Sequence, residues 1–451
     1  MNNKISLLYL ATALLALLLG MLFGIFSGLQ YILPEFIKEI LPFSSLRPFH
    51  VTSVIAWIIL CAIGGIYYYL SNSDGPRLYS NRLSKIHYLL FGGIGILIYY
   101  NYAIGNFGGK EYLEFPPYLI LPILIGWLLF GINYYKTMAG KVKDWPVYYW
   151  MWGTGIVFMV YHLSEAYLWL HPDMKNNFIK SLAIQWKAGG SFVGSWNMLV
   201  YGTAIYVMAK IKGDDSIGRH PKSFFFYFLG LTNLMFGWAH HIYIVPTAPW
   251  VRYVAYGISM TEWIILFHMI YEWKKSLPES AKIKNLISYK FLVMADAWVF
   301  LNLILALLFS IPAINFFTHG THITVAHSMG TTIGINTTIL LASVLFIVNQ
   351  IKPNFNLSQV KIGFRIFNIS LLLFWLSLLI AGMKRSYWMY FTKGIPFAEM
   401  QSQTHWVYVS FLLFGIGIFI GLLLIVVPVL KIIGGTFKQG KQMKLITNEK
   451  S

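Results

Sequence analysis

Several of the twelve histidines in this chain of 451 residues lie in long apolar stretches, where an ionisable side chain needs an explanation. His50 begins one such stretch, His240 and His241 are adjacent in another, and His327 lies in a third. If these stretches cross a membrane, burying an ionisable group there is costly, and such groups usually have a function. Imidazole is also the commonest protein ligand of metals. These four histidines are therefore the first candidates for a metal or haem site.

The adjacent pair His240 and His241 is an unusual arrangement for a helix. Neighbouring helix positions diverge by about 100°, so the two rings can converge on one metal only if the helix bends. Pro246 lies close enough to cause such a distortion. The alternative is two histidines that are hydrogen-bonded independently. Glu262 lies at a comparable depth in the next apolar stretch, where an unpaired carboxylate would be expensive.

His327 is followed two residues later by Met329. Residues two apart on a helix are separated by about 200°, so these side chains are expected to face opposite sides. One helix could then hold two metal centres, since histidine and methionine are both axial haem ligands and methionine raises the potential. The alternative is that Met329 is a packing residue, as most methionines in apolar helices are.

The composition identifies the elements that must position these residues. Hydrophobic residues make up 57% of the chain and charged residues 11%, whereas about a quarter of the residues of a soluble domain are charged. Disorder is excluded by the same apolarity. A disulfide scaffold is excluded because Cys61 is the sole cysteine. The chain is therefore expected to be an integral membrane protein.

A helix needs about 20 apolar residues to cross a bilayer, and the sequence predicts twelve such segments. They are 5–31, 48–70, 86–106, 117–135, 146–170, 184–209, 223–245, 251–273, 288–314, 320–349, 362–383 and 405–430. We expect an all-α polytopic protein in which residues 1–451 form a single membrane domain. Residues 434–451 are predicted to be a basic cytoplasmic tail.

The net charge of +18 results from 34 Lys and Arg against 16 Asp and Glu. Most of the basic residues fall in the loops on the same side as the two termini, which places both termini in the cytoplasm. This distribution explains the charge through membrane orientation, so no nucleic-acid partner is expected.

Five stretches of the sequence carry a family resemblance. They recur in order over nearly the whole chain: Leu46-Arg47-Pro48-Phe49-His50, Gly109-Lys110-Glu111-Tyr112-Leu113-Glu114, Gly237-Trp238-Ala239-His240-His241, the spacing to Glu262, and Thr318-His319-Gly320-Thr321 through His327. With histidines in spans 2, 7 and 10, the chain resembles the haem–copper oxidase superfamily, and within it the large cytochrome b subunit of bacterial nitric oxide reductase. No tyrosine near His240 matches the cross-linked tyrosine of the oxidases, which favours the reductase branch.

The resemblance implies two haem groups. His50 would be an axial ligand of a low-spin haem b, and His327 would be the proximal ligand of a high-spin haem b₃. The family has a second histidine two residues beyond the high-spin ligand, and Met329 occupies that place here. Met329 is thus the candidate for the second low-spin ligand, and His322 is a possible substitute.

The resemblance also implies metal and proton-handling residues. His240 and His241 would hold a non-haem metal that faces the high-spin haem, with Glu262 nearby. Glu111 would match a calcium-binding glutamate, and Glu114 would match a proton-path glutamate on the outer face.

Three positions depart from the family pattern. In the family, span 6 supplies a third metal histidine and a ligating glutamate, and here Gly189 and Val193 occupy those places. Asn197 stands where another acidic residue is usual. Two histidines and Glu262 are fewer ligands than a tight iron site normally uses. Iron, copper or no metal therefore remain alternatives at this position.

The resemblance implies an enzyme of the bacterial inner membrane that reduces NO to N₂O in denitrifying respiration. The chain has no Cys-x-x-Cys-His haem attachment motif, so we expect electrons to come from a small membrane-anchored cytochrome c subunit or from quinol. The altered ligands leave two alternatives open. One is dismutation of NO to N₂ and O₂, and the other is a non-catalytic haem protein for electron transfer or NO sensing.

Overall fold

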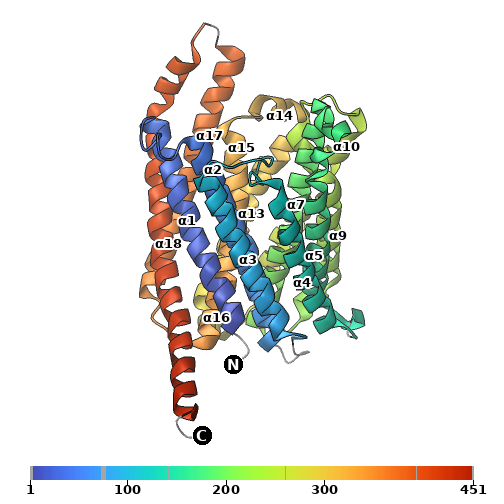
Figure 1. The fold of residues 1–451 in the computed structure, drawn as a ribbon, viewed down its shortest axis with the longest axis vertical. Helices are drawn as coiled ribbons and strands as arrows, with labels where there is room; N and C mark the ends of the chain where they lie inside the picture. Colours follow the sequence, from blue (N-terminus) through green and yellow to red (C-terminus); the bar gives the residue numbers. More distant parts are fainter. Residues whose placement is uncertain (1–3, 73–77, 141, 260, 393, 449–451) are drawn as a thin grey trace.

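The computed structural model describes residues 4–72, 78–140, 142–259, 261–392 and 394–448, and they form a helical bundle (Figure 1). The long helices are α1 Lys4–Ile32, α2 Phe43–Asn72, α3 Asn81–Ala103, α4 Ile120–Met138, α5 Val147–Glu165, α7 Phe178–Lys212, α9 Pro221–Phe236, α11 Thr261–Ser276, α13 Leu286–Ser310, α16 Thr338–Ile351, α17 Ser358–Phe391 and α18 Phe397–Asn448. The shorter elements are η1 Pro117–Leu119, η2 Val142–Asp144, η3 Leu168–Leu170, α6 Pro172–Lys175, α8 Ser216–Arg219, η4 Gly237–Ile242, α10 Pro249–Ile258, α12 Glu279–Lys284, α14 Pro312–Thr318, α15 His322–Met329 and η5 Gly330–Thr337. No strand occurs within these described ranges, so the all-α prediction is confirmed.

Every one of the twelve predicted spans contains helix. Ten helical segments of the described chain are long and apolar enough to cross a membrane. The remaining two predicted spans correspond to α5, with 19 residues, and α9, with 16 residues. Both termini lie at the same end of the bundle, beyond which α18 continues as helix to Asn448 (Figure 1).

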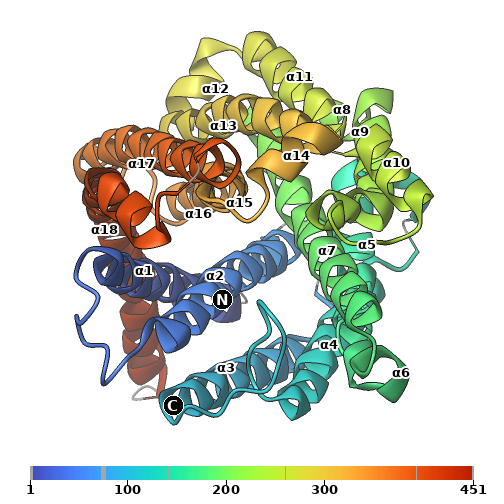
Figure 2. The ribbon, with the colours of Figure 1, turned by 90° about the horizontal axis from the view of Figure 1, so that it is seen from above.

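The central helices of the bundle are α7 and the continuous segment α15–η5–α16. In their most apolar windows 83% and 94% of residues are buried, whereas the figure for α3 is 22%. The view along the bundle shows α2, α7 and α15–α16 surrounded by the other helices (Figure 2). The segment that carries His327 is therefore the most enclosed of these spans.

Two of these segments depart from regular α-helix beside a histidine. Helix α9 ends at Phe236, and the following 3₁₀ turns of η4 carry His240 and His241. After α15, residues Gly330–Thr337 form a π-helix. The Asn302 side chain of α13 lies so close to Gly330 that a Cβ atom there would be 2.6 Å from its Oδ1. Short 3₁₀ and π segments inside helices are frequent at functional sites.

Candidate functional site

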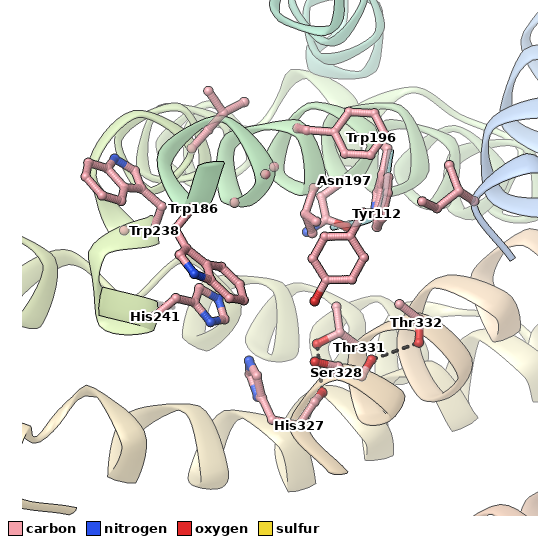
Figure 3. Close-up of a pocket in the computed structure, with 18 of the residues that line it drawn as sticks. Tyr112, Trp186, Trp196, Asn197, Trp238, His241, His327, Ser328, Thr331 and Thr332 are labelled. Atoms are coloured by element: carbon pink, nitrogen blue, oxygen red, sulfur yellow. Dashed lines mark hydrogen bonds between the residues drawn. The ribbon is translucent and has the colours of Figure 1, made fainter. Parts of the chain in front are cut away.

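One cavity brings together five of the residues that the sequence singled out. It is lined by His50, His240, His241, His327 and Met329, which come from α2, η4 and α15. Its wall on α7 includes the three positions where the sequence departs from the family pattern, namely Gly189, Val193 and Asn197. Asn197 is labelled in Figure 3. The volume of this cavity is about 200 Å³.

The ring of His50 is fixed by α1. Its Nδ1 donates a hydrogen bond to the carbonyl oxygen of Gly20 at 2.7 Å, which leaves the lone pair on Nε2. A Cβ atom at Gly24 would lie 2.9 Å from both Nδ1 and Cε1 of this ring, so a glycine is needed there. A backbone-bonded imidazole with a free second nitrogen is the usual arrangement of a metal-ligating histidine.

His327 lies at the other side of the cavity and is 6% exposed. Its ring packs against Trp263 and Phe309, with centroid separations of 6.1 and 5.6 Å. Its Nδ1 is buried and has no hydrogen-bond partner among the described residues. Buried polar atoms without partners are rare, so this nitrogen is an orphan that a bound metal would satisfy. Met329 also lines the cavity, together with the intervening Ser328.

His240 and His241 lie close together on η4, with ring centroids 4.1 Å apart. The Nδ1 of His240 donates to the Gly237 carbonyl oxygen at 2.6 Å, and the ring centroid lies 6.4 Å from that of His327. His241 is stacked on the indole of Trp186, with centroids 5.0 Å apart and planes inclined by 12°. The 3₁₀ geometry thus brings both imidazoles to one wall, as the predicted bend required.

The pair lacks a third ligand in the described part of the chain. No group of three or more His, Cys, Asp or Glu side chains suited to a metal ion is found there. Glu262 is 4% exposed and accepts a hydrogen bond from Asn233 Nδ2 at 2.7 Å. Asn233 lines the cavity, whereas Glu262 is not among the described lining residues. At Gly189, where the family has a ligand, a Cβ atom would meet no atom within 4 Å.

Glu111 and Glu114 lie in the 104–116 loop, at the end of the bundle opposite the termini, and both pair with Arg47. The guanidinium Nη1 lies 3.1 Å from Glu114 Oε1, and Nη2 contacts Glu111 Oε1. Burial raises the pKa of Glu114, and the Arg47 charge opposes this shift. Arg47 precedes His50 by one helical turn, so the carboxylate pair is linked to the turn that carries His50.

Tyr112 and Trp186 are two of the lining residues that the sequence did not single out as site residues. Tyr112 has a left-handed backbone with φ +70°, and its ring projects from the 104–116 loop into the cavity (Figure 3). Its ring contacts Trp186 edge-on, at 6.4 Å between centroids. Tyr112 lies in one of the resembling stretches, but nothing in its local sequence reveals the direction of its side chain. No periodic pattern in the sequence around Trp186 indicates that this side chain lines the cavity.

His322, the possible substitute ligand, begins α15. Its ring contacts those of Tyr31 and Tyr408, at 6.0 and 5.5 Å between centroids. Its Nδ1 and the Nε of Arg385 are both buried without hydrogen-bond partners among the described residues. These two donors are unpaired in the same way as His327 Nδ1, and a carboxylate-bearing ligand would satisfy them.

A comparison with known families decides the class of the protein. The sequence profile described as cytochrome c and quinol oxidase polypeptide I matches residues 4–435. The chain belongs to this family. Members of the haem–copper oxidase superfamily are oxidoreductases of membranes, and this chain is accordingly an oxidoreductase and a multi-pass membrane protein.

Individual relatives within the family are distant. The chain is 22% identical to the B subunit of nitric oxide reductase from Stutzerimonas stutzeri over 404 residues, which cover 83% of this chain and 82% of that protein. It is also 22% identical to the Cbb3-type cytochrome c oxidase subunit CcoN1 of the same organism over 253 residues, or 54% of this chain and 53% of that protein. A solved structure of a heme-copper terminal oxidase dimer matches 96% of this chain and 84% of that chain, with a TM-score of 0.71 and 12% identity. That structure supports the fold.

The described donors fit haem and do not fit a tightly held non-haem metal. His50 of α2 and His327 of α15 each have a ring nitrogen available in the same mostly apolar cavity. Iron(II) sites normally use more than two protein ligands, and only the two imidazoles of η4 meet on this wall. The donor chemistry therefore fits axial ligation of haem iron, while the second metal position is incomplete.

Proposed function

We propose that this protein is a nitric oxide reductase-like haem b oxidoreductase that acts on NO. The observation that carries the proposal is the meeting of His50, His327, His240 and His241, from three separate segments, around one cavity. The similarity to the B subunit of nitric oxide reductase over most of both chains supports NO as the substrate. The overall reaction is 2 NO + 2 e⁻ + 2 H⁺ → N₂O + H₂O.

The residues have distinct roles in this proposal. His50 and Met329 would hold a low-spin haem b, and His327 would hold a high-spin haem b₃; when bound, these groups would supply iron for NO chemistry and for electron transfer. His240 and His241 form the polar wall that faces the reacting molecules. Trp186 orients His241 by stacking. Glu114 is the proton-accepting group of the 104–116 loop, and Glu262 is a buried carboxyl held by Asn233, which lines the cavity.

The donor and the location complete the proposal. Electrons come from a small membrane-anchored cytochrome c subunit, or from quinol, at the end of the bundle that carries the 104–116 loop. The protein lies in a bacterial inner membrane with both termini in the cytoplasm, and residues 434–451 extend into the cytoplasm. Calcium at Glu111 is not needed for charge balance, because Arg47 already pairs with that carboxylate.

A second candidate reaction is dismutation, 2 NO → N₂ + O₂, which needs neither protons nor reductant. One observation favours it. Asn197 replaces the usual acidic residue and accepts a hydrogen bond from Asn336 Nδ2 at 3.0 Å, so this part of the wall is an amide pair. Amides do not exchange protons as carboxyl groups do. The amide pair therefore weakens any route by which protons would pass from Glu114 of the 104–116 loop to the cavity.

Labelled NO distinguishes these reactions. We expect the purified complex, supplied with ¹⁵NO and a reduced donor, to form ¹⁵N₂O while the donor is oxidised in proportion. Formation of ¹⁵N₂ and O₂ without donor oxidation would establish dismutation instead. Two bound haems with no turnover of NO would favour the non-catalytic electron-transfer or sensing role. A haem and iron assay on the same sample tests whether iron exceeds two atoms per chain.

A further inference from the structure

Two aromatic side chains separate three spaces in the molecule. Tyr112 and Phe192 line the histidine cavity, a second cleft between α1, α2, α3 and α4, and a small pocket beneath the 104–116 loop. Tyr112 comes from that loop and Phe192 from α7. Ile55 of α2 also lines both the histidine cavity and the cleft, but only Tyr112 and Phe192 are shared by the described linings of all three spaces. These two rings, with Ile55 beside them, therefore form a partition between the cavity and the cleft.

The second cleft is apolar and borders the outside of the bundle. Its walls include Leu15 and Leu19 of α1, which are 52% and 43% exposed, and Ile96 of α3, which is 72% exposed. At Gly92 and Gly95 of α3 a Cβ atom would meet no atom within 4 Å. These helices are among those apolar enough to cross a membrane, so the cleft faces the lipid side of the bundle. No Asp, Glu, Lys, Arg or His lines it in the described chain.

Tyr112 adopts a backbone conformation that is unfavourable for a residue with a side chain. A tyrosine with φ +70° is strained, because a Cβ atom is disfavoured in the left-handed region. The residues on either side hold the loop: Glu111 and Glu114 pair with Arg47, and Leu113 N donates to the Lys110 carbonyl oxygen at 2.9 Å. Lys110 Nζ lies 3.2 Å from Ser181 Oγ of α7. The loop is thus fastened to α2 and to α7, and the ring is directed inward between them.

We propose that Tyr112, with Phe192, is a size-selective partition through which uncharged small molecules pass between the membrane-facing cleft and the histidine cavity. The inference rests on the proposed function, since NO is an uncharged diatomic molecule. It adds that the loop determines the size of what enters. A charged or large molecule is excluded by the apolar walls and by the two rings, whereas a diatomic molecule needs only a small displacement of one ring.

The test uses two ligands of ferrous haem that differ in size, carbon monoxide and n-butyl isocyanide. Tyr112→Gly removes the ring, and glycine adopts φ +70° without strain, so the loop is expected to keep its conformation. Stopped-flow mixing with the reduced haem-loaded complex should show n-butyl isocyanide binding faster by a factor on the order of tenfold, a barrier change of about 1.4 kcal/mol. Carbon monoxide should change much less, because it already passes the partition.

Three further variants complete the experiment. Tyr112→Phe keeps the ring and should behave as the unchanged protein, whereas Phe192→Ala should reproduce the effect of Tyr112→Gly. Tyr100→Ala, at a 60% exposed tyrosine of α3, is the matched control and should change neither rate. Equal acceleration of both ligands, or no acceleration in Tyr112→Gly and Phe192→Ala, would overturn the partition. Absence of haem from the unchanged protein would instead contradict the proposed function, so the two failures are distinguishable.

Discussion

The two ends of the histidine cavity are built differently. At one end, the His50 ring is bonded to the Gly20 carbonyl, pressed against Gly24 and linked through Arg47 to two carboxylates. At the other end, His240 and His241 sit on a 3₁₀ turn opposite the open space at Gly189. A metal ligand is effective when its neighbours fix its orientation and complete its coordination. The first end has the fixed ligand, whereas the second retains imidazoles without the remaining ligands.

The largest expected effect is at the fixed end. His50→Ala should remove the low-spin haem and leave the high-spin haem, because His327 holds the latter from a different helix. Optical spectra and a pyridine haemochrome assay should show one haem per chain in place of two. His171→Ala, at a 63% exposed side chain, is the control. A normal low-spin spectrum in His50→Ala would remove the assignment.

The incomplete end should respond to the addition of a ligand. Gly189→His places a third imidazole on the α7 wall, where a Cβ atom meets nothing within 4 Å. We expect elemental analysis to find about one more equivalent of non-haem metal per chain than in the unchanged protein. Gly189→Leu, similar in bulk but without a donor atom, should show no increase. If the histidine and leucine variants bind equal amounts of metal, the site is not limited by its missing ligand.

The close contact at Gly24 offers a smaller change at the fixed end. Gly24→Ala brings a methyl group to 2.9 Å from the His50 ring, which must then shift or tilt. Overpacking of this kind costs about 1–3 kcal/mol. The thermal midpoint of haem loss should fall and the low-spin band should shift. Gly95→Ala, where a Cβ atom meets nothing, is the matched control. Identical behaviour of the two variants would show that α1 does not fix the ring.

The spectroscopy of Met329→His tests the second ligand of the low-spin haem. If Met329 ligates, replacing its thioether by imidazole should shift the low-spin band and lower the midpoint potential. A redox titration measures both effects. If the midpoint potential does not shift, Met329 is a packing residue and not a haem ligand.

The smallest effect concerns the pH dependence of stability. Burial raises the pKa of Glu114, so the folded protein holds this proton more tightly than the unfolded chain does. The resulting stabilisation is fully present below the unfolded value of about 4.5 and is lost as pH rises through the raised folded pKa. Glu114→Gln should flatten this part of the pH profile of thermal stability. Glu35→Gln, at an 82% exposed carboxylate, should leave it unchanged.

Much of the fold could be predicted from the sequence, because long apolar segments have one stable location in a bilayer. The places where these helices depart from regular α-helix, at η4 and η5, could not be predicted from the sequence. The π-helix after Met329 is contacted by Asn302, whose amide donates to the His327 carbonyl oxygen and to Thr331 Oγ1. These contacts join residues far apart in the sequence, so no local pattern records them.

The candidate site shows the same division. Its histidines could be recognised from the sequence, because an imidazole in an apolar segment stands out whatever the tertiary structure is. Tyr112 was not, since its direction depends on a left-handed backbone and on ion pairs between its neighbours and Arg47. Glu262 was identified correctly as a buried carboxyl, but its contact with Asn233 in place of the histidine pair arises from the packing of α9 on α11.

The pairing of one guanidinium with two acidic side chains has a consequence for assembly. Because the Arg47 guanidinium neutralises the two carboxylates of the 104–116 loop, the loop can fold without a bound divalent cation. Chelators such as EDTA should therefore leave this segment intact, whereas high ionic strength should loosen it by screening the attraction between the Arg47 guanidinium and its two carboxylates.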